Sequence, residues 1–345
     1  QQIEITDKWL QNGNPWEIVQ HNITYKIKFG GYTQTVSKPN GQYEVQWIAQ
    51  DEVKGIAYDT PVPGYKNNAI NLLRLWKAEA FEALDLSAFN HGNYGIAVQK
   101  KTWAETISKV LYPNDETEDG KRLRLMQQYF FVSCSLQNVI GIQLQRNKTL
   151  HDLPQTFALQ LNDTHPAISI AEMMRLLVDE HQMWWDEAWK ITQAVFSYTN
   201  HTLLPEALEK WPLQLFTALL PRHIEIIYEI NSRFLESVAQ QHPGNNTLLS
   251  NLSIIDETGG KAVRMAHLAS IGSHTINGVS QLHSKLLKED LLADFAKIKN
   301  KNIINVTNGV TPRRWMALNN PMLAKLISDY IGNAWIGNTQ EQLRK

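Results

Sequence analysis

Two segments of the chain share one arrangement: a short apolar run, a cluster of hydrogen-bonding side chains, a proline and then a helical pattern. They are Phe157-Ala-Leu-Gln-Leu-Asn-Asp-Thr-His-Pro166 and Phe196-Ser-Tyr-Thr-Asn-His-Thr-Leu-Leu-Pro205. A short strand that stops at polar residues and leads into a helix is one unit of a parallel α/β sheet. The polar side chains at the two strand ends include Asp163, His165, Asn200 and His201. Because ligands of open α/β sheets bind beyond the carboxyl ends of the strands, we expect a substrate there.

The rest of the chain after residue 157 continues this rhythm. We predict strands at 157–161, 195–199 and 303–307, and helices at 166–181, 184–194, 221–241, 262–270 and 277–287. Alternating short strands and helices predict an α/β fold with a Rossmann-like, mostly parallel sheet and flanking helices.

The first hundred residues are β-rich by their alternation of apolar and polar side chains. Strands are predicted at 25–29, 43–48 and 68–76, and a rigid loop at 59–64, where two prolines should end a ladder. Helices are predicted at 101–111 and 120–145, with an acidic loop between them. We therefore divide the chain into a β-rich segment (1–100), helices with a loop (101–150) and a βα region (151–345).

The composition narrows the class of ligand. The 345 residues carry a formal net charge of -1, which gives no attraction to nucleic acid or to an anionic membrane. No phosphate loop or dinucleotide glycine pattern is present, and no apolar run approaches the ~20 residues that span a bilayer. A soluble cytoplasmic protein that binds a neutral, polyhydroxylated ligand fits these features.

Each motif also has a simpler interpretation. Asp163 and His165 could hydrogen-bond sugar hydroxyls, or Asp163 and Thr164 could cap the following helix, and their spacing does not decide between the two. A metal site at Asp163, His165, His201 and Glu206 lacks a recognised ligand spacing, so we expect no metal.

Other polar residues are open to the same question. Glu206 and Glu209 could be a glycosidase pair, but three residues apart on one helix they would share one wall, and helix-start acids explain them better. The acidic loop 114–119 could be a gate or a solvated turn. Arg124, with Lys121 and Arg122, would usually be an exposed helical face. His283, like His267 and His274, is most simply a hydrogen-bonded structural histidine.

Several segments resemble the α-glucan phosphorylases, the glycogen, starch and maltodextrin phosphorylases, with the bacterial maltodextrin type most similar. The motifs occur in the family's order over nearly the whole chain. They are Asn14-Pro-Trp-Glu17, Tyr58-Asp-Thr-Pro-Val-Pro-Gly-Tyr65, Leu111-Tyr-Pro-Asn-Asp115, Gln160-Leu-Asn-Asp-Thr-His-Pro166, Tyr198-Thr-Asn-His-Thr202, Leu220-Pro-Arg-His223 and Thr307-Asn-Gly-Val-Thr-Pro-Arg-Arg-Trp315.

The resemblance implies a glycosyltransferase of the GT-B type, with two Rossmann-like domains facing a cleft. Such enzymes use phosphate to release glucose 1-phosphate from an α-1,4-glucan, require pyridoxal phosphate and commonly form homodimers, here through Trp103–Val110. By resemblance His201 would be catalytic: it would bind the 6-hydroxyl of the reacting glucose, and its carbonyl would stabilise positive charge in the transition state. The other residues implied to bind substrate are Asp163, His165, Asn200, Glu206, Glu209, Asn114, Asp115 and Glu116, the last three in a gating loop.

The chain also departs from the family pattern. Glu116-Thr117 replaces an Asn-Phe pair in the loop, and Gly141-Ile142 replaces an arginine pair that grips a nucleotide phosphate, so we expect no response to AMP. The lysine motif that binds pyridoxal phosphate does not occur in these residues. We therefore expect the interior part of the N-terminal domain, without the cofactor domain, without bound cofactor and inactive alone. The alternative is a non-catalytic glucan-binding or dimerising module.

Overall fold

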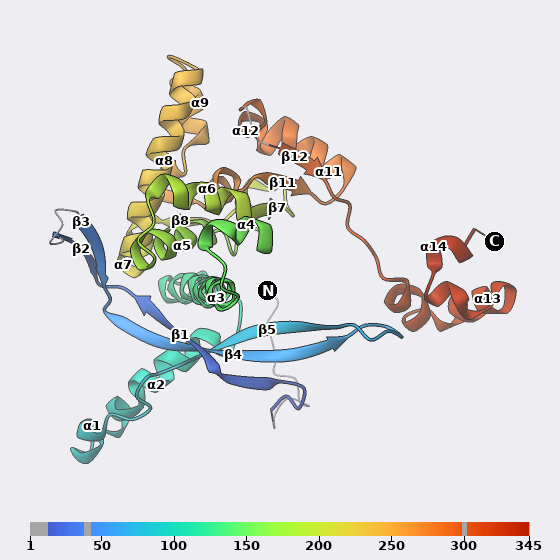
Figure 1. Cartoon of the computed structure of the whole chain (residues 1–345), viewed down its shortest axis with the longest axis horizontal. Helices are drawn as coiled ribbons and strands as arrows, with labels where there is room; N and C mark the ends of the chain where they lie inside the picture. The colour runs from blue at the N-terminus through green and yellow to red at the C-terminus, as the bar shows by residue number, and fades with distance from the viewer. Residues whose placement is uncertain (1–12, 38–42, 299–301, 345) are drawn as a thin grey trace.

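The computed structural model describes residues 13–37, 43–298 and 302–344. Its first part is a long antiparallel sheet in the order β1-β4-β5 (Figure 1), and β2 pairs with β3 beside it. The strands are β1 (Ile18–Phe29), β2 (Tyr32–Ser37), β3 (Tyr43–Ile48), β4 (Asp51–Pro63) and β5 (Ile70–Glu79). The predicted β-rich character of this part is confirmed.

The rigid loop predicted at 59–64 is wrong, because β4 continues to Pro63. Pro61 lies opposite Leu72 of β5 in regular register. The pairing of β1 with β4 reaches only to Asp59, so beyond that point the described part of β4 has a free edge. A proline is tolerated at an edge because the strand needs no N–H on its free side.

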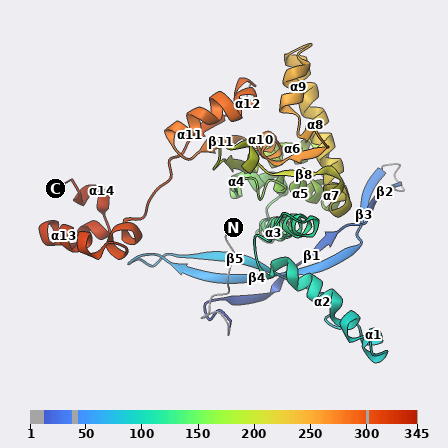
Figure 2. The same cartoon turned by 180° about the vertical axis from the view of Figure 1, so that it is seen from behind.

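Three helices follow the antiparallel sheet. They are α1 (Leu86–Asn90), α2 (Tyr94–Lys109) and α3 (Glu118–Gln145). The predicted helices at 101–111 and 120–145 are confirmed, although α2 begins earlier. In both views α3 lies between the antiparallel sheet and the later α/β layer, while α1 and α2 project away (Figures 1 and 2). Thus α3 has one side toward each layer.

The later part contains a four-stranded, all-parallel sheet in the order β12-β11-β7-β6. Its strands are β6 (Leu159–Asn162), β7 (Phe196–Thr199), β11 (Thr275–Gly278) and β12 (Asn302–Asn305). Leu161, Tyr198 and Ile276 point into the core, whereas the alternate residues Thr199 and Asn277 hydrogen-bond to each other on the other face. The predicted α/β fold with a parallel sheet is confirmed.

Helices pack around this sheet, and a small antiparallel sheet lies beside it. The helices are α4 (Leu153–Thr156), α5 (Ser169–Arg175), α6 (Trp185–Val195), α7 (Leu213–Leu219), α8 (Pro221–Gln241), α9 (Asn246–Leu252), α10 (Met265–Gly272), α11 (Gln281–Leu286) and α12 (Ala293–Lys297). The small sheet has the order β8-β10-β9, with β8 (Lys210–Pro212), β9 (Ile255–Asp256) and β10 (Ala262–Arg264).

Two predicted helices begin too early in the sequence. Residues 262–264 form β10, where Val263 pairs with both Trp211 and Ile255, and 275–278 form β11 in the middle of the parallel sheet. The helices start only after these strands. Partners far away in the sequence decide the strand conformation here, and local propensity does not show them.

The C-terminal helices stand apart from the rest of the chain (Figures 1 and 2). α13 (Pro321–Ile331) and α14 (Thr339–Gln342) follow an extended connection. The guanidinium group of Arg313 lies 4.9 Å from the ring centre of Tyr65, next to the β4–β5 hairpin. Among the described residues, none of the helices has the length and apolar character that crossing a membrane requires.

Candidate functional site at the carboxyl ends of the parallel strands

Asp163 follows the last residue of β6 and turns the chain out of the sheet. Its φ of 67° lies in the left-handed region, and its N–H donates to the carbonyl of Thr199 (3.0 Å). The helix-cap interpretation is wrong, because α5 starts at Ser169 with Ile168 at its N-cap position and no capping side chain. Instead, Oδ1 of Asp163 is buried without a hydrogen-bond partner among the described residues. A buried acceptor of this kind is unusual, and a donor from a ligand or an ordered water would satisfy it.

Asn200 occupies the matching place after β7. It is fully buried; its N–H donates to the Asn277 carbonyl (2.9 Å) and its Nδ2 donates to the Tyr198 hydroxyl (3.2 Å). Its Oδ1 also has no partner among the described residues. Burial raises the pKa of Tyr198 well above its usual value, and the charges of Asp163 and Glu209 raise it further. The phenol therefore stays neutral beside two unpaired acceptors.

Glu209 is held by three neighbours. Its Oε1 accepts from Arg124 Nε (3.1 Å), Arg124 Nη2 (2.9 Å) and Gln128 Nε2 (2.8 Å), and its Oε2 accepts from Thr164 Oγ1 (3.2 Å). The Arg124 side chain is only 18% exposed, so the prediction that it belongs to a solvated helical face is wrong. These bonds fix the carboxylate and connect α3 to the chain after β6.

His165 belongs to the same cluster. Its Nε2 lies 3.2 Å from Arg124 Nη2, and its ring meets that of Tyr112 edge-on at 6.0 Å. Because a guanidinium N–H can only donate, Nε2 of His165 is the acceptor and the ring proton lies on Nδ1. The side chain is 37% exposed, so this Nδ1–H is open to a ligand or solvent.

His201 is exposed and forms a hydrogen bond with Asn162, the last residue of the neighbouring strand β6. Its Nε2 lies 2.7 Å from Asn162 Oδ1. Since this oxygen can only accept, Nε2 carries the proton and Nδ1 keeps its lone pair. His165 and His201 therefore offer opposite atoms, a donor and an acceptor, at the ends of two paired strands.

Asp115, Glu206 and Glu209 line one cavity of about 570 Å³. Glu206 lies in the 3-10 turn Pro205–Ala207 and Glu209 lies beyond it, so the interpretation of both as acids at the start of one helix is wrong. A second cavity of about 180 Å³ has an apolar lining that includes Tyr112 and His165. Arg124 lines both cavities.

The acidic loop folds against the first turn of α3. Asn114 Oδ1 accepts the N–H of Glu116 (3.0 Å), and Thr117 Oγ1 caps the helix by accepting the N–H of Gly120 (3.1 Å). A Cβ atom on Gly120 would lie 1.7 Å from the Asn114 carbonyl oxygen, so only glycine permits this packing. The fold brings Asp115 to the cavity, whereas Asn114 and Glu116 are exposed and do not line either cavity.

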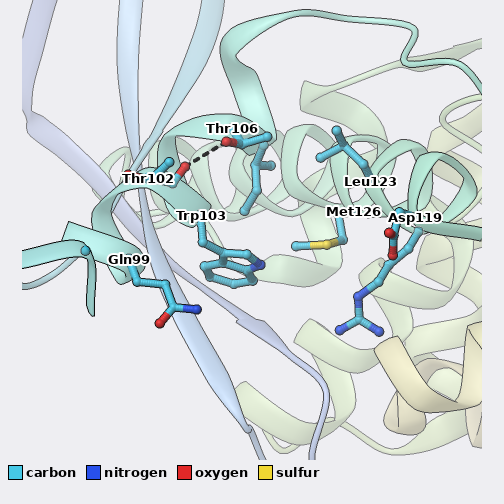
Figure 3. Close-up of a pocket in the computed structure, with 10 residues that line it drawn as sticks. Gln99, Thr102, Trp103, Thr106, Asp119, Leu123 and Met126 are labelled. Atoms are coloured by element: carbon cyan, nitrogen blue, oxygen red, sulfur yellow. Dashed lines mark hydrogen bonds between the residues drawn. The ribbon is translucent and has the colours of Figure 1, made fainter. Parts of the chain in front are cut away.

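A third cavity, of about 570 Å³, lies between α2 and α3. Figure 3 shows the Trp103 indole near Met126, with Asp119 and Leu123 farther along α3. The other two cavities are lined from a different face of α3, which carries Lys121, Arg124 and Gln128. These residues are three and four positions apart and therefore lie on one side of the helix. This cavity is therefore separate from the strand ends.

The polar cluster holds no group of metal ligands among the described residues. Among the residues that the structure places, no three histidine, cysteine or acidic side chains are grouped to hold a metal ion. The cavity that contains Glu206 and Glu209 is also lined by Lys121 and Lys210. Lys121 is ion-paired with Glu118 and Lys210 with Asp256, each at 2.8 Å. Both lysine ammonium groups at this cavity are therefore paired with carboxylates.

The sequence does not indicate that four further residues belong to the site, namely Arg124, Gln128, Tyr198 and Asn162. A weak signal exists for the first two: they lie four residues apart, and therefore on one face of a predicted helix. No pattern in the sequence pairs them with Glu209, which lies more than 80 residues later.

Comparison with known proteins agrees with this geometry. The family model described as carbohydrate phosphorylase matches residues 1–345. The chain is 58% identical to the glycogen phosphorylase of Synechocystis sp. over 340 residues, covering 99% of this chain and 40% of the relative. It is 48% identical to that of Chlamydia pneumoniae (97% and 41% covered) and 45% identical to the human muscle form (100% and 41% covered). The chain thus spans about 40% of the length of these relatives. It belongs to the carbohydrate phosphorylase family.

Proposed function

We propose that this chain supplies one wall of the active-site cleft of an α-1,4-glucan phosphorylase. The complete enzyme would convert a glucan and phosphate into glucose 1-phosphate and a shortened glucan. The observation that carries the proposal is the cluster of buried, unpaired polar atoms at the ends of β6 and β7, in a chain of this family. Such atoms suit the hydroxyl groups of a sugar, which both donate and accept.

The roles proposed for individual residues follow from their contacts. His201 would bind the reacting glucosyl unit through its free Nδ1, and its backbone carbonyl would face the positive charge that develops as the C1–O4 bond breaks. Asp163 and Asn200 would accept from sugar hydroxyls. His165, Glu206 and Glu209 would face the neighbouring glucose units, and Asn114, Asp115 and Glu116 would form the loop above them.

A hydrolytic role for the two glutamates is disfavoured by the structure. Glu209 accepts three hydrogen bonds at one oxygen and is ion-paired with Arg124, so it is poorly placed to serve as a free nucleophile or base. Pyridoxal phosphate, which the family resemblance implies for the complete enzyme, is assigned no residue of this chain.

We also propose that the complete enzyme is a homodimer with α1 and α2 at the contact. These helices project from the molecule (Figure 1) and carry large apolar side chains that are exposed. The side chains are Leu86, Phe89, Tyr94, Ile96 and Val98. A row of exposed apolar residues of this size is typical of a protein interface.

The function is tested by the product released from maltoheptaose by the complete protein, expressed from the parent reading frame. We expect glucose 1-phosphate that forms only when phosphate is present. Free reducing sugar in the absence of phosphate would indicate a hydrolase. Binding of maltoheptaose without any turnover would indicate the non-catalytic module and would overturn the proposal.

A further inference from the structure

His283 lies at the end of β11, next to β7, and is not used in the proposed function. It is in the first turn of α11, and its Nδ1 accepts the N–H of Val279 (3.1 Å). A Cβ atom on Gly278 would lie 2.7 Å from this Nδ1 and 2.5 Å from Ser284 Oγ. The imidazole is therefore packed against the backbone of the strand end, where glycine leaves room for it.

The contact with Val279 determines where the ring proton lies. A backbone N–H can only donate, so Nδ1 has the lone pair and Nε2 carries the proton. Burial lowers the pKa of His283, and a proton on the neighbouring His201 ring would lower it further, so the neutral form of His283 is favoured. Nε2 is buried and has no hydrogen-bond partner among the described residues. The interpretation as a structural histidine therefore accounts for only one of its two nitrogens.

His201 offers the complementary atom at the next strand. Its Nε2 donates to Asn162 Oδ1, which leaves Nδ1 as an acceptor. β7 and β11 are paired, and the N–H of Asn200, the residue before His201, donates to Asn277 at the end of β11 (2.9 Å). One neutral donor and one neutral acceptor thus lie at adjacent strand ends. A hydroxyl group can bond to both, because it accepts from one and donates to the other.

We propose that His283 is a second histidine at the reacting glucosyl unit, whose Nε2–H donates to the same hydroxyl that donates its hydrogen to His201 Nδ1. The inference rests on the proposed phosphorylase function. Because Nε2 is buried in the free chain, the side chains that cover it must shift slightly as the sugar enters. The pair would make the enzyme selective for a sugar that carries this hydroxyl, since a deoxy sugar leaves both ring nitrogens unpaired.

Two substitutions separate the proposed role from packing. In His283→Asn the amide oxygen can still accept from Val279, near the position of Nδ1, but the Nε2 donor is lost. In His283→Gln the longer amide can place an N–H near the position of Nε2. Both are made in the complete enzyme, and kcat/KM is measured in the direction of glucan synthesis. The donors are glucose 1-phosphate and its 2-, 3- and 6-deoxy analogues.

With glucose 1-phosphate we expect His283→Asn to lower kcat/KM by roughly fivefold to tenfold, as for loss of one hydrogen bond between neutral groups. With one deoxy analogue the loss should disappear, and the same analogue should reduce the effect of His201→Asn. His283→Gln should recover part of the activity. Thermal unfolding shows whether both variants are folded. If His283→Asn does not fold, His283→Gln still tests whether an N–H donor at the position of Nε2 is needed.

An equal loss with all four donors, or no loss, would overturn the role of His283 while leaving the phosphorylase function intact. If the unsubstituted enzyme forms no glucose 1-phosphate and uses none, both proposals fail.

Discussion

Arg124 holds three side chains of the candidate site with one planar guanidinium group. Its Nε and Nη2 donate to Glu209, Nη2 also contacts His165 Nε2, and the group lies 5.5 Å from the ring centre of Tyr112. A lysine ammonium could not reach all three in this geometry, because it lacks the fork of fixed donors. The position of Glu209 and the tautomer of His165 both depend on this residue.

We predict that Arg124→Ala lowers the free energy of unfolding by about 2 kcal/mol, because it leaves a mostly buried carboxylate without its cation. The KM for glucan in the complete enzyme should rise, and Arg124→Lys should be intermediate. Urea unfolding and initial rates measure the two effects. Arg233→Ala is the matched control, since Arg233 forms its ion pairs at the surface. Equal effects of Arg124→Ala and Arg233→Ala would contradict the role given to Arg124.

At the scale of elements, a buried ion pair joins three helices. Glu172 of α5 accepts from Ser133 of α3 (2.6 Å), from Arg175 of α5 (2.7 Å) and from His223 of α8 (2.6 Å). Burial alone would raise the pKa of Glu172, but the charge of Arg175 and the hydrogen bonds from His223 and Arg175 lower it to about 2. The ionised carboxylate is thus the form that the fold stabilises.

The sign of the pH dependence follows from this shift. The stabilisation is complete above the unfolded pKa of 4.5 and is lost as the pH falls toward 2. Glu172→Gln should therefore lower the free energy of unfolding at pH 7 by roughly 3–5 kcal/mol, since Arg175 then keeps only its ion pair with the half-exposed Glu180. The difference from the wild type should shrink below pH 4.5. Urea unfolding at pH 7, 4.5 and 3 measures it, and a difference that does not change with pH would contradict the assignment.

The elements show which parts of the fold the sequence determines locally. α8 has the predicted bounds, Pro221–Gln241, because its apolar spacing and its first-turn proline are local signals. β10 and the last two residues of β11 fall within predicted helices, because their strand conformation depends on β8, β7 and β12, which lie far away in the sequence. The strand ends after β6 and β7 are also predicted from a local signal, a short apolar run that stops at a polar cluster. The contact of Glu209 with Arg124 joins residues far apart in the sequence, and no local signal predicts it.

At the scale of the whole molecule, the projecting helices α1 and α2 are proposed to form the subunit contact. We predict that Ile96→Lys in the complete enzyme shifts the protein from dimer to monomer, because a buried charge without a partner opposes association. Trp184→Lys, at another exposed apolar site, is the control and should remain dimeric. Sedimentation velocity distinguishes the two states. A monomeric parent enzyme, or an unchanged dimer in Ile96→Lys, would contradict the proposed interface.

The parallel sheet and α3 bring together residues that lie more than 80 positions apart, and the polar strand ends lie where these layers meet. The most direct test is kcat/KM for phosphorolysis of maltoheptaose by the complete enzyme carrying His201→Asn. His151→Asn is the control, because His151 is exposed and does not belong to the cluster. We predict a loss on the order of 100-fold for His201→Asn, as for the removal of a group that stabilises the transition state, and no loss for His151→Asn. Full activity in His201→Asn would contradict the assignment of the active site to the carboxyl ends of β6 and β7.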